Sequence, residues 1–173
     1  MGARQAKRLL APGRWMWRCV CEPGPTGLGV LTAWFNGADE AEEKGAGMRW
    51  EQALLVMLGG GVGAVLRWCA GLMLVRVGGS VSQATLLVNV VGSLAMGVLL
   101  AWFQAKPSAH WQLLLTTGVL GGLTTFSTFS AEWLQLWQRG AVWGAWLHVL
   151  AHVGLALLAV TAGHALVQRW MAA

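Results

Sequence analysis

Charged residues are scarce in this chain, and they are unevenly placed. Only 11% of its 173 residues are charged, whereas 56% are hydrophobic. Five of the seven acidic residues and six of the twelve basic residues lie before Met48, so the rest of the chain has very little charge. This shortage excludes an ordinary soluble domain and is typical of a protein that crosses a membrane several times.

Other missing features exclude further classes of protein. Three cysteines provide no disulfide framework. The hydrophobic part of the chain has no basic cluster with interleaved aromatic residues, the pattern that would indicate nucleic-acid binding. The sequence contains no phosphate-binding loop. No Ser/His/Asp or metal-ligand constellation assembles across the apolar segments. We therefore do not expect an enzyme.

Residues 1–47 differ from the rest of the chain. Pro12, Pro23 and Pro25 interrupt them, and no apolar run reaches the roughly 20 residues that a membrane helix needs. Proline and glutamate fall where a signal peptide would have its apolar core. The purine-rich codons expected for Glu42–Gly47 are typical of a ribosome-binding site ahead of Met48. We expect residues 1–47 to be a disordered tail or a wrongly assigned extension, and residues 48–173 to be the membrane domain.

The membrane domain is predicted to be all-α, with four transmembrane helices. Short connections make helices that follow each other in sequence antiparallel neighbours. Several tryptophans lie near the expected helix ends, as an aromatic belt would: Trp50, Trp102, Trp111, Trp137, Trp143 and Trp170. Each of the four segments meets the length criterion: Gln52–Val75, Val81–Phe103, His110–Trp137 and Ala141–Val167.

The flanking basic residues give almost no preferred orientation. From Met48 onward, one side of the membrane has Arg49, Lys106 and Arg169, and the other has Arg76 and Arg139. A difference this small is a weak positive-inside signal. We expect the chain to insert in both orientations and to form an antiparallel dimer with a two-fold axis in the membrane plane.

The first helix contains a glycine motif and a basic residue. Gly59 and Gly63 have the spacing that lets helix backbones approach closely, and close packing is their expected role. Arg67 lies in the second half of this helix, where a charge usually faces protein or water. It either draws anions into a vestibule or reaches toward the membrane interface beside Trp68.

The second helix has one amide near its middle. Asn89 must find a hydrogen-bond partner there. Its amide can donate two hydrogen bonds to an anion, or it can join two helices. Taken alone, the residue favours the second interpretation.

The third helix is predicted to be interrupted. Gly121-Gly122 weakens the helix, and polar backbone at membrane depth is tolerated only in protein or beside a cavity. Carbonyls freed between Gly121 and Thr124 could hold a cation such as Na⁺, and a two-fold axis would bring four oxygens together. Six hydroxyl or carboxyl side chains follow the glycines: Thr124, Thr125, Ser127, Thr128, Ser130 and Glu132.

Two phenylalanines in this segment share a helix face. Phe126 and Phe129 are three residues apart, and the edge of an aromatic ring has partial positive charge. The two ring edges could replace part of the hydration of a small anion, with the nearby hydroxyl groups as donors. An isolated pair of this kind would only indicate packing, but this pair is embedded in a hydroxyl-rich segment.

Three motifs together closely resemble the CrcB/Fluc family of fluoride channels, and the resemblance covers Met48–Ala173. The most specific is G-x-L-G-G-L-T-T-F-S-T-F-S-x-E, from Gly118 to Glu132. The other two, in the order of the family, are Gly60-x-x-Gly63-Ala64-x-x-Arg67 and Thr85-Leu86-x-Val88-Asn89-x-x-Gly92-Ser93.

The resemblance implies both an architecture and a function. The family consists of dual-topology antiparallel homodimers of four-helix subunits, with two fluoride pores and one central structural Na⁺. The chain would be a multi-pass protein of a bacterial inner membrane. It would export cytoplasmic fluoride passively and so reduce fluoride toxicity.

The resemblance also implies roles for particular residues. The backbone carbonyls of Gly121 and Thr124 would bind the Na⁺. Phe126 and Phe129 would contact fluoride in the pore. Asn89 would be a pore amide and Arg67 a vestibule cation, while a polar track would comprise Thr125, Ser127, Thr128, Ser130, Glu132 and helix 4 residues.

The fourth helix departs from the family pattern. Where the family often has Tyr, Ser and Ser at four-residue spacing, this chain has His148, His152 and Ala156. The two imidazoles can donate hydrogen bonds, whereas Ala156 cannot. In the pore, they would make conduction depend on pH near the histidine pKa. The pair also has the spacing of metal ligands, but the sequence shows no third ligand nearby.

Two other functions are compatible with four short apolar helices. The first is a small dual-topology multidrug/proton antiporter, which needs a membrane-embedded carboxylate that is typically in helix 1. Helix 1 here has Arg67 and no acid within its span. The second is a non-transporting assembly protein, which would not explain the stripe of phenylalanines and hydroxyls. Pairing with a paralogue as a heterodimer is also compatible with the sequence.

Overall fold

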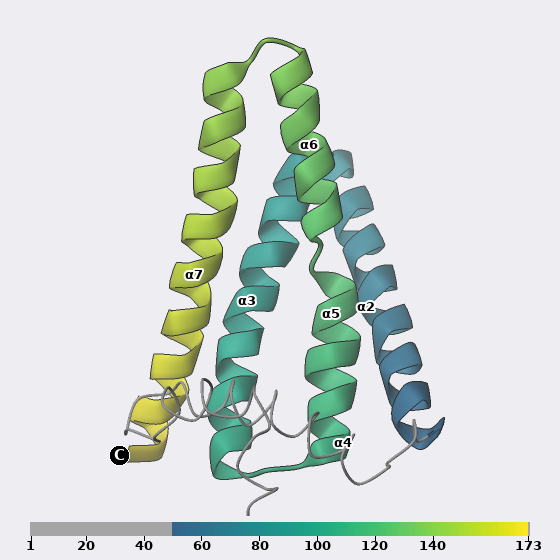
Figure 1. The fold of residues 1–173 in the computed structure, drawn as a ribbon, viewed down its shortest axis with the longest axis vertical. Helices are drawn as coiled ribbons and strands as arrows, with labels where there is room; N and C mark the ends of the chain where they lie inside the picture. The colour runs from purple at the N-terminus through teal and green to yellow at the C-terminus, as the bar shows by residue number, and fades with distance from the viewer. Residues whose placement is uncertain (1–49, 173) are drawn as a thin grey trace, which may run out of the picture. The chain divides into compact units, whose positions relative to one another are not determined.

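The computed structural model describes residues 50–172, which form helices and turns without any β-strand. In chain order the helices are α2 (Trp50–Arg76), α3 (Val81–Ala105), α4 (Ala109–Gln112), the π-helix η2 (Leu113–Leu120), α5 (Gly121–Leu123), α6 (Phe126–Gln138) and α7 (Val142–Ala172) (Figure 1). The expectations for residues 1–47 lie outside the described part of the chain.

The predicted number of membrane-spanning helices is confirmed. Four helical segments are long and apolar enough to cross a membrane: Trp50–Arg76, Val81–Ala105, Ala109–Gln138 and Val142–Ala172. The last helix continues five residues beyond the expected end at Val167. Arg169 lies in its final turn, where a positive charge interacts favourably with the helix dipole.

Glycines make the sharp turns between helices possible. Gly78 after α2 and Gly140 after α6 have φ angles of 86° and 74°, a region that residues with a Cβ rarely adopt. Helix α3 then begins with a capping box, in which the Ser80 hydroxyl accepts from the Gln83 backbone N–H and the Gln83 side chain accepts from that of Ser80. These turns explain why the connections predicted from the sequence can be so short.

The backbone of the third span leaves the helical conformation at Thr124 and Thr125. Their φ and ψ angles are −79° and 153°, and −149° and 120°. Gly121 remains helical, with φ −62° and ψ −36°. The extended residues therefore come just after the glycine pair rather than at it. The preceding π-helix was not anticipated from the sequence.

Close glycine contacts hold the helices together. At the crossing of α2 with the third span, a Cβ added to Gly63 would collide with the carbonyl oxygen of Val119, and one added to Gly118 would lie 2.9 Å from Cα of Gly59. Helix α3 packs along α7 (Figure 1). There, Gly97 and Gly163 leave no room for a Cβ against the facing backbone. The packing role predicted for the first helix glycines fits this geometry.

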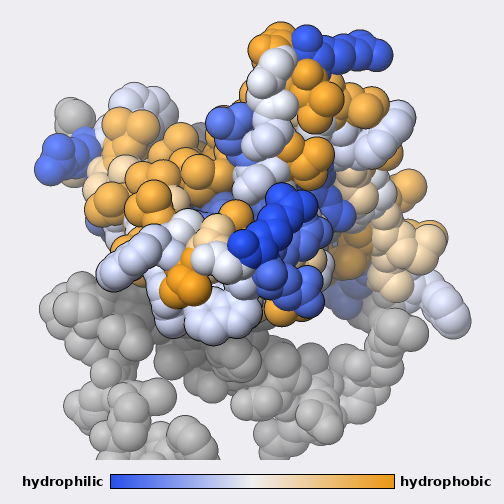
Figure 2. Space-filling model, turned by 90° about the horizontal axis from the view of Figure 1, so that it is seen from above, coloured by the Kyte–Doolittle hydropathy of each residue, from blue (hydrophilic) through white to orange (hydrophobic). Residues whose placement is uncertain are grey.

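The outer surface suits a lipid environment. Large apolar side chains such as Leu58, Met73 and Leu147 are exposed along the helices, and the end view in Figure 2 shows hydrophobic residues over much of the outer surface. The six tryptophans expected near helix ends are all exposed: Trp50, Trp102, Trp111, Trp137, Trp143 and Trp170.

The Gly63 contact gives a test of this packing. We expect Gly63→Ala to lower the free energy of unfolding by about 1–3 kcal/mol, the usual range for overpacking a close contact. Gly61→Ala, two residues away on the same helix, is the matched control because a Cβ there meets nothing within 4 Å. Thermal unfolding in detergent measures both variants. Equal stability of the two variants would contradict the packing described.

Candidate functional site

The extended backbone at Thr125 is paired with a side chain of α3. The Thr125 N–H donates to Oδ1 of Asn89 at 2.8 Å, and Nδ2 of Asn89 donates to the Thr125 carbonyl oxygen at 3.2 Å. The amide thus supplies both hydrogen bonds that this residue loses by leaving the helix. Asn89 joins two helices, as one interpretation of the sequence proposed, and it retains a second N–H on Nδ2.

The two carbonyl groups expected to bind a cation have both lost their helical donors, one to this pairing and the other to the cap of α6. In a regular helix the Gly121 carbonyl would accept from the Thr125 N–H, which instead donates to Asn89. The Thr124 carbonyl would accept from the Thr128 N–H, which instead donates to the Thr125 hydroxyl at 3.2 Å. Carbonyl oxygens in this state are suitable ligands for a hard cation such as Na⁺.

Hydroxyl groups gather at the beginning of α6. The Thr125 side chain caps this helix, donates to the Thr128 hydroxyl at 3.1 Å and lies 3.2 Å from that of Ser127. The N-terminus of a helix is electropositive because its first N–H groups point outward along the axis. Ser130 is different, since its hydroxyl donates to the Phe126 carbonyl of its own helix at 2.9 Å.

The two phenylalanines lie together but in different environments. Their ring centroids are 5.2 Å apart, with the planes at 49°. Phe129 is only 8% exposed, whereas Phe126 is 77% exposed. The buried ring stacks on His148 at 5.2 Å between centroids, and the His152 ring lies 4.9 Å away. Phe129 therefore connects the hydroxyl-rich segment of α6 with the histidines of α7.

An open cavity of about 370 Å³ lies between α3, the Thr124–Thr125 segment, α6 and α7. It brings together residues that are far apart in the sequence, and its wall is mixed polar and apolar. Among the residues that line it are Asn89, Ser93, Thr124, Thr125, Phe126, Phe129, His152 and Ala156.

A second cavity, of about 490 Å³, lies on the side of α2. Arg67 lines it together with Thr85 and Thr128, and Thr125 lines both cavities. The basic side chain therefore faces a hollow that leads to the hydroxyl cluster. This position is compatible with the predicted vestibule role.

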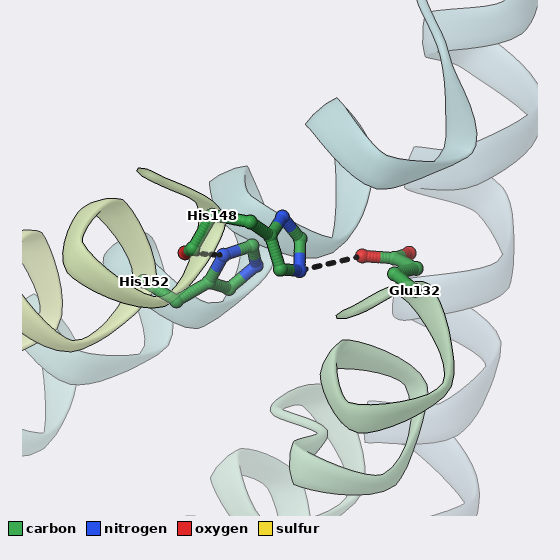
Figure 3. A group of neighbouring side chains, drawn as sticks. All are labelled: Glu132, His148 and His152. Atoms are coloured by element: carbon green, nitrogen blue, oxygen red, sulfur yellow. Dashed lines mark hydrogen bonds and ion pairs between the residues drawn. The ribbon is translucent and has the colours of Figure 1, made fainter. Parts of the chain in front are cut away.

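The structure supplies the third ligand that the sequence did not reveal. Glu132 of α6 faces the two histidines of α7, with Oε2 3.4 Å from Nε2 of His148 (Figure 3). One potential ligand atom from each of Glu132, His148 and His152 lies within 4.8 Å of the other two. The expectation that no third ligand is near the histidine pair is wrong. The turn after α6 folds α7 back along it, so that Glu132 and His148, both eight residues from Gly140, meet at the same level.

Two polar residues of α3 complete the site and were not singled out from the sequence as site residues. The Thr85 hydroxyl donates to Oε1 of Glu132 at 2.6 Å, and Ser93 lines the first cavity. Thr85, Asn89 and Ser93 are spaced by four residues, which places them on one helix face. That four-residue spacing is the sequence signal that could have identified Thr85 and Ser93 as site residues. Ser127 is exposed in the single chain. Its predicted role in a pore would therefore need other molecules, such as a second copy of the chain, to surround it.

Comparisons with known proteins show which family this chain resembles. Residues 54–164 match the family model described as CrcB-like protein, Camphor Resistance (CrcB). A protein of Methylobacterium nodulans named fluoride-specific ion channel FluC is 45% identical over 120 residues, which are 68% of this chain and 96% of the relative. A protein of Aromatoleum aromaticum with the same name is 50% identical over 121 residues, which are 68% and 91% of the two chains.

The matched region contains the polar residues of α3, the Thr124–Thr125 segment, the phenylalanine pair and both histidines. The family resemblance read from the three motifs is therefore confirmed, and this chain belongs to the CrcB family.

Proposed function

We propose that this chain forms a fluoride-selective channel in a bacterial inner membrane, through which cytoplasmic fluoride leaves passively. Its relatives are named for this activity, and its four apolar helices suit a multi-pass membrane protein. A channel is not an enzyme. The observation that carries the proposal is the buried Phe129 ring between the capped start of α6 and the histidines of α7.

Fluoride is small and strongly hydrated, so a pore must replace its water without binding it too tightly to release. The hydroxyls near the start of α6 and the second N–H of Asn89 can donate hydrogen bonds. The edges of Phe126 and Phe129 offer weaker, positively polarised C–H groups. Arg67 beside the second cavity raises the local concentration of anions. A path of many weak donors satisfies both requirements.

Export needs no energy source beyond the membrane potential. Fluoride enters cells as HF in acid surroundings and is trapped as the ion at neutral pH. The negative interior drives an anion outward once a selective path exists. The residues from Met48 onward contain no nucleotide-binding loop.

The functional unit in this proposal is an antiparallel homodimer. The balanced basic residues from Met48 onward support insertion in both orientations, and the exposed ring of Phe126 would be covered by a partner. The carbonyls of Gly121 and Thr124 from two copies would provide four oxygens for one structural Na⁺. This cation would hold the interrupted spans together at the two-fold axis.

The phenylalanine pair gives the most direct test of conduction. We expect purified full-length protein in liposomes to release fluoride but not chloride, as followed with ion-selective electrodes. Phe126→Ile with Phe129→Ile should slow fluoride efflux at least about tenfold, the factor that corresponds to about 1.4 kcal/mol of lost stabilisation. Phe103→Ile is the matched control because Phe103 lines a separate hollow near Lys106.

Two results would contradict the channel. One is equal efflux of chloride and fluoride, and the other is fluoride efflux that does not depend on the phenylalanine pair. Proton-coupled uptake of cationic drugs without fluoride flux would instead indicate the multidrug/proton antiporter.

The cation site is tested by stability. A ligand present at 100 times its Kd adds about 2.7 kcal/mol to the free energy of unfolding. We expect Na⁺ to raise the Tm of the detergent-solubilised protein by about 5–11 °C over the same concentration of N-methylglucamine. Identical Tm values in the two salts would remove the structural Na⁺ from the proposal.

Dual topology is tested by labelling one cysteine from one side of the membrane. Gln138→Cys, in residues 48–173 with Cys69 changed to serine, places a thiol at the exposed end of α6 without changing the balance of basic residues. We expect an impermeant maleimide to label roughly half of the copies in spheroplasts, because the basic residues favour neither orientation. Labelling of all copies, or of none until the membrane is opened, would contradict dual topology.

A further inference from the structure

Three side chains of α6 and α7 direct unpaired polar atoms toward one another. They are Oε2 of Glu132 and the Nε2 atoms of His148 and His152, and none has a hydrogen-bond partner among residues 50–172. The side chains of His148 and Glu132 are 8% and 12% exposed, and His152 is 5% exposed. Buried polar groups without partners are costly, so three such atoms at one point call for an explanation.

Hydrogen bonds behind two of the three residues, His152 and Glu132, leave lone pairs facing inward. The carbonyl oxygen of His148 can only accept, so Nδ1 of His152 carries the proton of their 3.1 Å hydrogen bond (Figure 3). This tautomer leaves the lone pair on Nε2 of His152. The Thr85 hydroxyl similarly occupies Oε1 of Glu132 and leaves Oε2 available. Protein metal sites use the same outer hydrogen bonds to orient their ligands.

An ion pair between Glu132 and His148 explains only part of this geometry. The 3.4 Å separation of Oε2 and Nε2 falls within salt-bridge distance, but neither atom makes a hydrogen bond. The distance between Oε2 and Nε2 does match the roughly 3.3 Å expected between two ligand atoms that are each about 2.0–2.1 Å from a tetrahedral zinc ion. Nε2 of His152 remains unpaired in the ion-pair interpretation. A cation among the three atoms would satisfy all of them.

We propose that Glu132, His148 and His152 bind a divalent transition-metal ion of the Zn²⁺ class. Two imidazole nitrogens and one carboxylate oxygen suit Zn²⁺, Co²⁺ or Ni²⁺, whereas Mg²⁺ and Ca²⁺ prefer oxygen ligands alone. The ligand atoms lie within 4.8 Å of one another, so small side-chain rotations bring them to bonding distance. Three protein ligands leave a fourth position for water or a small anion.

The position in the fold makes such an ion accessible. Glu132 lies six residues before the end of α6, and His148 lies six residues after the beginning of α7. At 1.5 Å per residue, both are about 9 Å from the helix ends. His152 also lines the first cavity.

A bound ion would regulate the path described above, and this consequence rests on the proposed function. A divalent cation between Phe129 and the polar residues of α3 would attract fluoride strongly and narrow the path. An ion that binds fluoride too tightly stops conduction, because permeation needs rapid release. Zn²⁺ is therefore expected to inhibit fluoride efflux, and a chelator to restore it.

Metal binding is measured directly on the detergent-solubilised full-length protein. Cysteines 19, 21 and 69 are replaced by serine in every variant because thiolates bind Zn²⁺, and no histidine tag is present. We expect calorimetry to show about one Zn²⁺ per chain, and Co²⁺ to give the strong visible absorption of a four-coordinate site. His148→Ala, His152→Ala and Glu132→Gln should each weaken binding at least about tenfold.

His164→Ala is the matched control, since His164 is on the same helix three turns beyond His152, and it should bind Zn²⁺ like the parent. Absence of Zn²⁺ binding, or equal affinity in the parent and both cluster histidine variants, would overturn the proposal. The fluoride efflux experiment distinguishes the proposed metal site from the proposed channel function. Zn²⁺ binding without fluoride efflux would keep the metal site and reject the channel, whereas normal efflux without Zn²⁺ binding would do the reverse.

Discussion

The two hydrogen bonds between Asn89 and the backbone of Thr125 are the interaction on which the rest of the site depends. A membrane-spanning segment leaves the helical conformation only where other groups satisfy its backbone, because the bilayer core offers no water. Asn89 provides a donor and an acceptor at that point. Without it, an N–H and a carbonyl would be buried unpaired, at a cost of about 1–3 kcal/mol each.

Several features follow from this one exchange of partners. The Gly121 carbonyl loses its helical donor to Asn89, and the Thr124 carbonyl loses its donor to the Thr125 hydroxyl that caps α6, so both become available to a cation. A new helix begins at Phe126, capped by the buried Thr125 hydroxyl. That new start also sets the rotation of α6, which directs Phe129 and Glu132 toward α7. The close glycine contacts of α2 and α3 hold the surrounding helices near enough for these groups to meet.

Much of this arrangement could be predicted from the sequence, because hydropathy and spacing act locally. The four spans follow from apolar length, and the three motifs identified the family. The π-helix of Leu113–Leu120 was not predictable, because no pattern in that apolar run distinguishes it from an α-helix. The break was expected from Gly121-Gly122, but the decisive partner is on another helix. The Glu132–His148–His152 cluster was missed because spacing along α7 shows only the two histidines, whereas the third potential ligand comes from the antiparallel neighbour.

The most direct test replaces the amide of Asn89 by an apolar group of similar size. In Asn89→Leu, compared with Thr161→Val on the exposed face of α7, the account predicts that fluoride efflux and the Na⁺-dependent rise in Tm are lost together. Both depend on the extended backbone that Asn89 stabilises, whereas Thr161→Val should retain both. An Asn89→Leu protein with normal fluoride efflux and normal stabilisation by Na⁺ would contradict the central claim.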